Sequence, residues 1–241
     1  MKNKVWIEKE LFLFYDKYKK IKKMDLWFGI IPFISKNSTD IKKYFSNIIK
    51  IIVKNRKFKK MIIGFDIAHY KNTNNNLFLL DDDIKYVKDE LKINDIKINF
   101  LFHAGENDNE NSKLDMEYAY ENGWNRIGHG IHWLNIDKFI KKKIMLEICP
   151  ISNLYFKNIE SLQHYEYIVN NAIFSINSDD CNKFNDWDLN DNFYIMCNHF
   201  KFNKKKIKTI IKNWINYCYA SKKIKKIMLL KLKNFYKKWK K

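Results

Sequence analysis

Three short segments of this sequence place groups that bind metal ions or transfer protons directly after apolar, strand-like stretches. In the first, His103 and Glu106 follow the β-prone run at 96–101, and in the other two His129 and Asp179 hold similar positions. Histidine and aspartate are common zinc ligands, and a glutamate close to a metal can shuttle a proton without binding it. Active sites of β/α barrels lie at the carboxyl ends of their strands. The three segments therefore predict a zinc hydrolase site at such an edge.

Glycine is concentrated in the same segments. Only six of the 241 residues are glycine, and Gly105, Gly128 and Gly130 are three of them. Arg126, one of two arginines, precedes the second segment, whereas the composition elsewhere drifts toward lysine and asparagine. Residues that escape this drift are those that backbone geometry or chemistry demands. Gly105 in particular allows the backbone to turn the carboxylate of Glu106 over the strand end.

The same residues also have structural interpretations, which the sequence leaves open. A lone histidine at a strand end is more often a hydrogen-bonded structural group, although Glu106 three residues on favours function for His103. His129 lies between two glycines, which allow a ligand to approach closely. Asp179 and Asp180 would repel each other unless a cation or donors compensate, but aspartate-rich sequences also form turns. None of the four cysteines forms a Cys-x-x-Cys pair, which disfavours a cysteine-only zinc site.

Strand-like and helix-like patterns alternate along the chain and would position these groups. Six apolar segments are predicted as strands, at 27–34, 61–67, 96–102, 125–130, 144–150 and 172–177. Helical spacing predicts helices at 7–19, 41–52, 81–92, 135–142 and 160–170, and a helical tail at 190–200, 204–219 and 222–239. Buried strands separated by helices indicate a parallel sheet, and no linker interrupts the pattern. The prediction is one α/β domain over residues 1–241.

Composition narrows the class of protein. Apolar residues make up 46% of the chain, as in a globular protein, and no apolar run approaches the roughly 20 residues of a membrane span. The first residues open an amphipathic segment and not a signal peptide, so a cytoplasmic location is expected. The net charge of +19 would suit a nucleic-acid partner, but all except two of the 46 basic residues are lysine. Because arginine leads specific contacts to bases, a solvated lysine-rich surface is favoured.

Four motifs follow one another in a characteristic order and spacing. They are His103-Ala104-Gly105-Glu106, Arg126-Ile127-Gly128-His129-Gly130, Leu146-Glu147-Ile148-Cys149-Pro150-Ile151-Ser152-Asn153 and Ser175-Ile176-Asn177-Ser178-Asp179-Asp180. From about residue 8 to its end the chain resembles the adenosine deaminase family, most of all its branch of adenosine deaminase-related growth factors. The resemblance implies a metal-dependent hydrolase with one zinc ion and a (β/α)₈ TIM barrel. About six of the eight strands would be present, followed by a helical C-terminal tail.

The resemblance also implies a role for each group at these strand ends. His103 and Asp179 would be zinc ligands, Glu106 would donate a proton to N1 of the purine, and His129 would orient the zinc-bound water. Zinc lowers the pKa of a bound water to about 7, which makes hydroxide available at neutral pH. The implied reaction is the hydrolytic deamination of adenosine or deoxyadenosine to inosine or deoxyinosine and ammonia.

The substrate-binding residues implied by the resemblance are Asp180, which would hydrogen-bond the purine ring, together with Gly105 and His69. Three departures from the family pattern accompany them. The family carries two further zinc ligands in a His-x-His pair on its first strand, and no His-x-His occurs in this sequence. His69 stands where the family has a glycine that touches the purine, and Cys181 replaces the proline that follows the two aspartates.

These departures leave rival hypotheses open. With only His103 and Asp179 as ligands, zinc would bind substoichiometrically, because a catalytic site usually takes three protein ligands. The chain would then be a catalytically inactive, truncated homologue that binds a purine nucleoside or interacts with another protein. An AMP deaminase is a narrower rival, for which the sequence lacks a compact basic phosphate motif. Six strands would also leave the barrel open, so self-association or a missing N-terminal segment in trans is expected to fill the gap.

Overall fold

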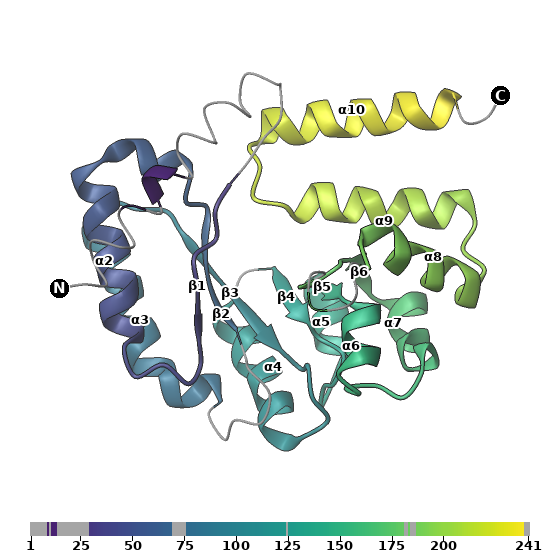
Figure 1. Cartoon of the computed structure of the whole chain (residues 1–241), viewed down its shortest axis with the longest axis horizontal. Coiled ribbons are helices and arrows are strands. Elements are labelled where there is room, and N and C mark those ends of the chain that lie inside the picture. Colours follow the sequence, from purple (N-terminus) through teal and green to yellow (C-terminus); the bar gives the residue numbers. More distant parts are fainter. Residues whose placement is uncertain are drawn as a thin grey trace. The chain divides into compact units, whose positions relative to one another are not determined.

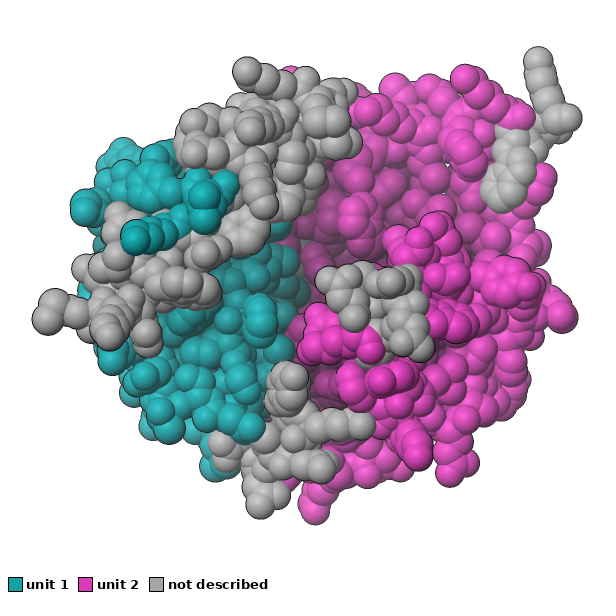
Figure 2. All heavy atoms as spheres, viewed as in Figure 1, with its two compact units in different colours: residues 1–101 teal, residues 102–241 magenta. Residues whose placement is uncertain are grey.

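The computed structural model describes residues 9, 11–13, 29–68, 76–123, 125–180, 183 and 187–238 (Figure 1). The chain divides into two compact units, Met1–Leu101 and Phe102–Lys241, which Figure 2 shows in different colours. Each unit has helices and strands of its own, and the single domain over 1–241 stays a prediction. Within the described ranges, every helix is too short or too polar to cross a membrane.

Unit 1 contains a parallel strand pair and two longer helices. The strands are β1 (Phe33–Ser35) and β2 (Gly64–Ala68), and the helices are α2 (Ile41–Lys54) and α3 (Asp81–Ile93), with short 3-10 turns at Arg56–Lys60 and Leu77–Leu80. The ring of Phe45 in α2 stacks on Phe65 of β2 with 4.4 Å between centres, so the apolar face of α2 covers the sheet. Within the strand predicted at 27–34, Ile30 forms a parallel bridge with Ile62 and the continuous strand begins at Phe33, while residues 27–28 lie outside the described residues. The helix predicted at 7–19 also lies largely outside them.

Unit 2 begins within β3 (Asn99–Ala104) and continues with β4 (Arg126–His129), β5 (Met145–Ile148) and β6 (Ile173–Ile176). Each of these strands is parallel to the next, and the register places His103 opposite Gly128 and Gly128 opposite Glu147. The connections contain α4 (Glu110–Asn122), α5 (Asp137–Lys142), α6 (Pro150–Tyr155), a 3-10 turn at Leu162–Tyr165 and α7 (Glu166–Asn171). The predicted alternation of strand and helix is confirmed, whereas α6 was not predicted.

The last part of unit 2 is helical, as predicted. It consists of α8 (Leu189–Phe200), α9 (Lys204–Tyr217) and α10 (Lys222–Lys238). Asp188 begins α8 in a reciprocal capping box with Asp191, and Asn203 caps α9 by accepting from the N–H of Lys206. α9 packs against β6, and α10 runs beside α9 (Figure 1). The six described strands and this helical end confirm the predicted α/β class.

Candidate active site

The predicted catalytic and metal-binding residues lie in unit 2, at or just after the carboxyl ends of its strands. His103 is the penultimate residue of β3, and Glu106 comes two residues after that strand. His129 ends β4, and Asp179 comes three residues after β6. Because β3 to β6 are adjacent and parallel, their carboxyl ends bring these side chains to the same edge of the sheet.

The backbone is left-handed at the turns that present these groups. The angle φ is 61° at His129 and 57° at Asp179, and it is 65° at Gly105 and 63° at Gly130. A Cβ atom at Gly105 would also lie 2.5 Å from the carbonyl oxygen of His132, so a side chain has no room there. A positive φ is uncommon outside glycine, and such strain gathers at functional sites. The local backbone therefore supports a functional interpretation of both His129 and Asp179.

His129 lies at the centre of the cluster. Its Nε2 atom is 3.9 Å from Oε2 of Glu106 and also 3.9 Å from Oδ2 of Asp179. The ring of His103 lies beside it, with 5.4 Å between the ring centres. The structure thus brings together the four residues to which sequence analysis gave catalytic or metal-binding roles.

The segment that follows β5 holds both carboxylates. Ser152 of α6 donates from Oγ to Oδ2 of Asp179 at 2.6 Å, and Asn158 donates from Nδ2 to Oε1 of Glu106 at 3.3 Å. Burial by itself would raise the pKa of Asp179, but the attraction of His129 and the hydrogen bond from Ser152 outweigh it, so this pKa lies below its ordinary value. Asp179 is therefore held in its charged form, which suits a ligand of a cation.

The other ring nitrogen of His129 is held from inside the core. Its Nδ1 atom lies 3.2 Å from Nδ2 of Asn153, which also belongs to α6. The hydroxyl of Tyr165 donates to Oδ1 of the same amide at 2.8 Å. Asn153 and Tyr165 are fully buried and His129 is only 2% exposed. α6 and the turn after it therefore support the histidine as well as the carboxylates, and sequence analysis gave these supporting residues no role.

A group of possible metal ligands lies within the cluster. Ligand atoms of His129, Cys149 and Asp179 lie within 4.8 Å of one another. Nitrogen, sulfur and oxygen donors of these types all bind zinc, so the donor set fits that ion. Burial, and after it the charges of Asp179 and Glu147, raise the pKa of the Cys149 thiol well above its ordinary value. Sequence analysis gave Cys149 no metal-binding role, although it lies at the carboxyl end of a strand, as the other candidates do.

The structure describes two of the three predicted substrate-binding residues, Gly105 and Asp180. Gly105 lies in the turn between His103 and Glu106. Asp180 is exposed, and its Oδ2 atom forms an ion pair with Nζ of Lys183 at 2.6 Å. His69 lies outside the described residues. Their contacts to a purine stay a prediction.

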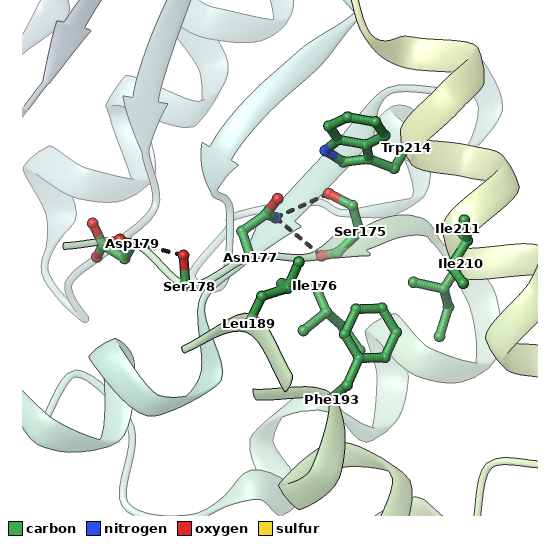
Figure 3. Close-up of a pocket in the computed structure, with 10 residues that line it drawn as sticks. All are labelled: Ser175, Ile176, Asn177, Ser178, Asp179, Leu189, Phe193, Ile210, Ile211 and Trp214. Atoms are coloured by element: carbon green, nitrogen blue, oxygen red, sulfur yellow. Dashed lines mark hydrogen bonds between the residues drawn. The ribbon is translucent and has the colours of Figure 1, made fainter. Parts of the chain in front are cut away.

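A pocket of about 320 Å³ lies beside β6 and shares one residue with the cluster. Figure 3 shows Asp179 and Ser178 at one end of it and Trp214 and Ile211 toward the other. The remaining lining residues are Ser175, Ile176, Asn177, Leu189, Phe193 and Ile210. The pocket is therefore polar next to the carboxylate and apolar toward α8 and α9.

Comparison with known sequences identifies the relatives of this chain. The family model described as adenosine deaminase matches residues 38–235. An adenine deaminase of Aspergillus oryzae is 34% identical over 125 residues, which cover 49% of this chain and 34% of that protein. An adenosine deaminase 2 of Sus scrofa is 31% identical over 147 residues, which cover 57% of this chain and 28% of that protein. The matches thus span about a third or less of the length of these relatives.

Solved structures share the fold. The apo structure of an N6-methyl-AMP deaminase from Arabidopsis thaliana has a TM-score of 0.69 at 18% identity and covers 86% of this chain and 58% of that chain. An amidohydrolase from Burkholderia ambifaria with bound zinc has a TM-score of 0.68 at 16% identity and covers 87% of this chain and 57% of that chain. At these identities the likeness concerns the fold alone, and it confirms the predicted fold class.

Proposed function

Because the chain belongs to the adenosine deaminase family, we propose that it hydrolytically deaminates adenosine or deoxyadenosine to inosine or deoxyinosine and ammonia. The observation that carries the proposal is the convergence of Glu106 and Asp179 on Nε2 of His129, each at 3.9 Å. The likeness to an adenosine deaminase 2 supports a place near the growth-factor branch of the family.

Asp179 and His103 are the proposed holders of the zinc ion. Asp179 suits this role because Ser152 fixes its carboxylate and its lowered pKa keeps it charged. The thiol of Cys149 offers a further donor, within 4.8 Å of the ligand atom of Asp179. A bound zinc ion would supply the Lewis acidity that activates a water molecule at neutral pH.

Glu106 is the proposed proton carrier and His129 the group that orients water. Glu106 would protonate N1 of the purine while water adds to C6, after which the amino group leaves as ammonia. Asn158 holds Oε1 of Glu106, which leaves Oε2 on the side of His129. A positioned general acid of this kind contributes roughly 10²- to 10⁴-fold to a rate.

Asp180, Gly105 and His69 are the proposed contacts to the purine. The matched part covers only a minor fraction of the relatives, so family membership does not fix which purine is the substrate. The likeness to an adenine deaminase adds free adenine to the candidate substrates. A panel of adenosine, deoxyadenosine, adenine and AMP, incubated with the zinc-loaded chain and analysed by mass spectrometry, tests the assignment. Inosine or deoxyinosine as the favoured product supports it, and exclusive turnover of adenine or AMP contradicts it.

A second candidate is a non-catalytic member of the family that binds a nucleoside. The observation that favours it is the absence of a His-x-His pair from the sequence. Equilibrium dialysis with labelled adenosine separates the two candidates. Saturable binding without any product in the presence of zinc would support the second candidate, and product formation would exclude it.

A further inference from the structure

We propose that the exposed face of helix α10 is a docking surface for the anionic surface of a lipid bilayer, on which the chain lies without crossing it. This α10 face consists of Lys222, Lys226, Ile227, Leu230, Lys233 and Lys237. None of these residues belongs to the candidate active site, so the inference does not depend on the function proposed above.

Positive charge is concentrated at the C-terminal end of the sequence. The last 50 residues, 192–241, contain 16 lysines and no aspartate or glutamate. The first 191 residues hold the other 30 basic residues and all 27 acidic ones, a net charge of only +3. A drift of composition toward lysine would act along the whole chain and does not explain why the acidic residues stop at Asp191. A basic segment at one end of a sequence is typical of proteins that bind nucleic acids or membranes.

Some of these lysines serve the packing of the terminal helices. Lys206 of α9 donates from Nζ to the carbonyl of Val169. Nζ of Lys208, also in α9, lies 5.2 Å from the ring centre of Tyr236 in α10. Lys225 of α10 in turn donates to a backbone carbonyl of α9. α9 and α10 lie side by side (Figure 1), and these contacts account for three of the lysines as structural.

Four other lysines form a row on the exposed side of α10. Lys222, Lys226, Lys233 and Lys237 are spaced i, i+4, i+11 and i+15, which places them along one side of the helix, and all four are exposed. At a rise of 1.5 Å per residue the row extends over about 22 Å. Because residues 192–241 contain no acidic residue, the row has no counter-charge within the terminal helices. Like charges four residues apart destabilise a helix, and an anionic surface would remove that repulsion.

Two aliphatic side chains are exposed beside this row. Leu230 is 57% exposed and Ile227 is 36% exposed. Leu230 follows Lys226 by four residues and precedes Lys233 by three, so it is their neighbour on the helix surface. A bilayer with anionic lipids offers negative headgroups for the lysines and hydrocarbon directly below them for the aliphatic groups. The α10 face has both kinds of side chain that such a surface binds.

Other occupants fit this face less well. A nucleic acid offers phosphates but no hydrocarbon for Ile227 and Leu230, and residues 192–241 contain no arginine, the residue that leads specific contacts to bases. A second copy of the chain offers no strongly anionic segment, because even residues 1–191 have a net charge of +3. Clusters of four to eight basic residues on an amphipathic helix are typical of binding to anionic lipids.

Co-sedimentation of the full chain with lipid vesicles tests the proposal. The probes are vesicles of phosphatidylcholine alone and vesicles in which about one third of the lipid is anionic phosphatidylserine. We expect binding to the anionic vesicles only. Added salt should weaken it, because the Debye length falls from about 10 Å at 0.1 M to about 3 Å at 1 M. Equal binding to both kinds of vesicle, or binding to neither, overturns the proposal.

Substitution of the four lysines of the α10 face by glutamine tests the role of the row. The partition onto anionic vesicles should fall by at least about a hundredfold, since each lysine near such a surface contributes about fivefold. The urea midpoint should stay near that of the parent, because the replaced side chains are exposed. The matched control removes as many charges from exposed positions of α2 and α3, at Lys43, Lys50, Lys54 and Lys92. An equal loss in the control would mean that net charge alone decides, which overturns the proposal.

Leu230→Ser tests the contribution of the hydrocarbon layer. It should lower the partition onto anionic vesicles by about tenfold, because burial of the leucine side chain is lost. Leu134→Ser is the matched control, since Leu134 is 60% exposed in the loop before α5. An unchanged partition of Leu230→Ser, or the same loss in the control, would show binding by charge alone and overturn the proposal.

A labelled single-stranded oligothymidylate distinguishes a lipid partner from a nucleic acid. With half-saturation expressed per phosphate or per anionic lipid, we expect weaker binding to the oligonucleotide than to the anionic vesicles at the same salt concentration. Tighter binding to the oligonucleotide overturns the proposal. A chain that binds the anionic vesicles but does not deaminate adenosine contradicts the proposed function and leaves the role of the α10 face intact.

Discussion

The two ends of strand β4 carry polar side chains with opposite surroundings. At the amino end, Arg126 forms an ion pair with Glu147 of β5, and both side chains are largely buried. At the carboxyl end, His129 faces Glu106 and Asp179 at 3.9 Å, too far for direct hydrogen bonds. The side chains of the first group are in direct contact as an ion pair, whereas the polar atoms of the second group do not hydrogen-bond one another directly.

The difference indicates that the amino end of β4 contributes to stability and its carboxyl end to the reaction. The guanidinium of Arg126 also lies 5.1 Å from the ring centre of Tyr219, so an aromatic ring covers the pair. In β/α barrels the amino ends of the strands serve stability and the carboxyl ends serve activity. Substitutions at Arg126 should therefore change the free energy of unfolding, and substitutions around His129 should change the rate.

The largest expected effect is at the amino end. Arg126→Ala should lower the free energy of unfolding by about 3–5 kcal/mol, because it leaves the buried carboxylate of Glu147 without its cation. Replacing both partners by methionine should restore much of the loss. Urea denaturation measures both variants, with Lys85→Ala, which removes an exposed pair with Asp81, as the control that should change little. An Arg126→Ala protein as stable as its parent would show that the pair is not structural.

At the carboxyl end, Glu106→Gln should lower the deamination rate by about 10²-fold or more, the scale of a general acid, and leave the unfolding transition in place. The variant keeps an oxygen that accepts from Asn158, so its packing is preserved. Glu110→Gln, an exposed change in the first turn of α4, is the matched control. Near-parent turnover in Glu106→Gln would remove Glu106 from the mechanism.

A smaller effect is expected at Ser152, which lies at the active-site edge and also contributes to stability. Its hydrogen bond lowers the pKa of Asp179, so Asp179 stabilises the fold above its unfolded pKa of about 3.9 and loses that contribution as the pH falls through its folded pKa. Ser152→Ala should raise this pKa and cost about 1.5–3 kcal/mol near neutral pH, the range for a hydrogen bond to a charged group.

Urea midpoints between neutral and acidic pH test this sign. The parent should lose more stability on acidification than Ser152→Ala does. Ser46→Ala is the control, since its buried hydroxyl has no partner among the described residues and should leave the pH dependence unchanged. Parallel pH profiles for the parent and Ser152→Ala would contradict the role of this hydrogen bond.

The smallest expected effect is self-association through the edge of the sheet. β6 pairs with β5 and has no second partner strand in the described part of unit 2. An open edge favours association, so light scattering should give a mass above that of one chain. Side chains oppose this outcome, because Asn177 and Asn213 donate to the carbonyls of Ser175 and Phe174. A stable monomer would mean that such contacts suffice.

Much of this arrangement could be predicted from local sequence, and the rest depends on distant contacts. His103, Glu106, His129 and Asp179 were found because each follows an apolar strand, a pattern that needs only neighbouring residues. The terminal helices were found in the same way, from the periodicity of their apolar faces. For the strand predicted at 27–34, parallel pairing is present at Ile30 and the continuous strand begins at Phe33, because an apolar run does not fix where an unbroken ladder begins.

The roles of the supporting residues carry no local signal, although Asn153 ends one of the four motifs. Asn153, Asn158 and Tyr165 act through hydrogen bonds to partners 24, 52 and 12 residues away. Their side chains are ordinary in any window of sequence, and only the fold brings them to the site. Cys149 could have been proposed as a metal ligand from the sequence, since it directly follows β5. Only its short distance to Asp179 in the structure makes it a candidate ligand.

Isotope incorporation tests the proposed hydrolysis at this edge most directly. The zinc-loaded chain is incubated with adenosine in ¹⁸O-labelled water, and the purine product and ammonia are measured together. Hydrolytic deamination predicts inosine with one ¹⁸O atom at C6, one ammonia for each inosine, and little of either from Glu106→Gln. Bound adenosine recovered unchanged, or labelled inosine formed equally fast by Glu106→Gln, would contradict the account.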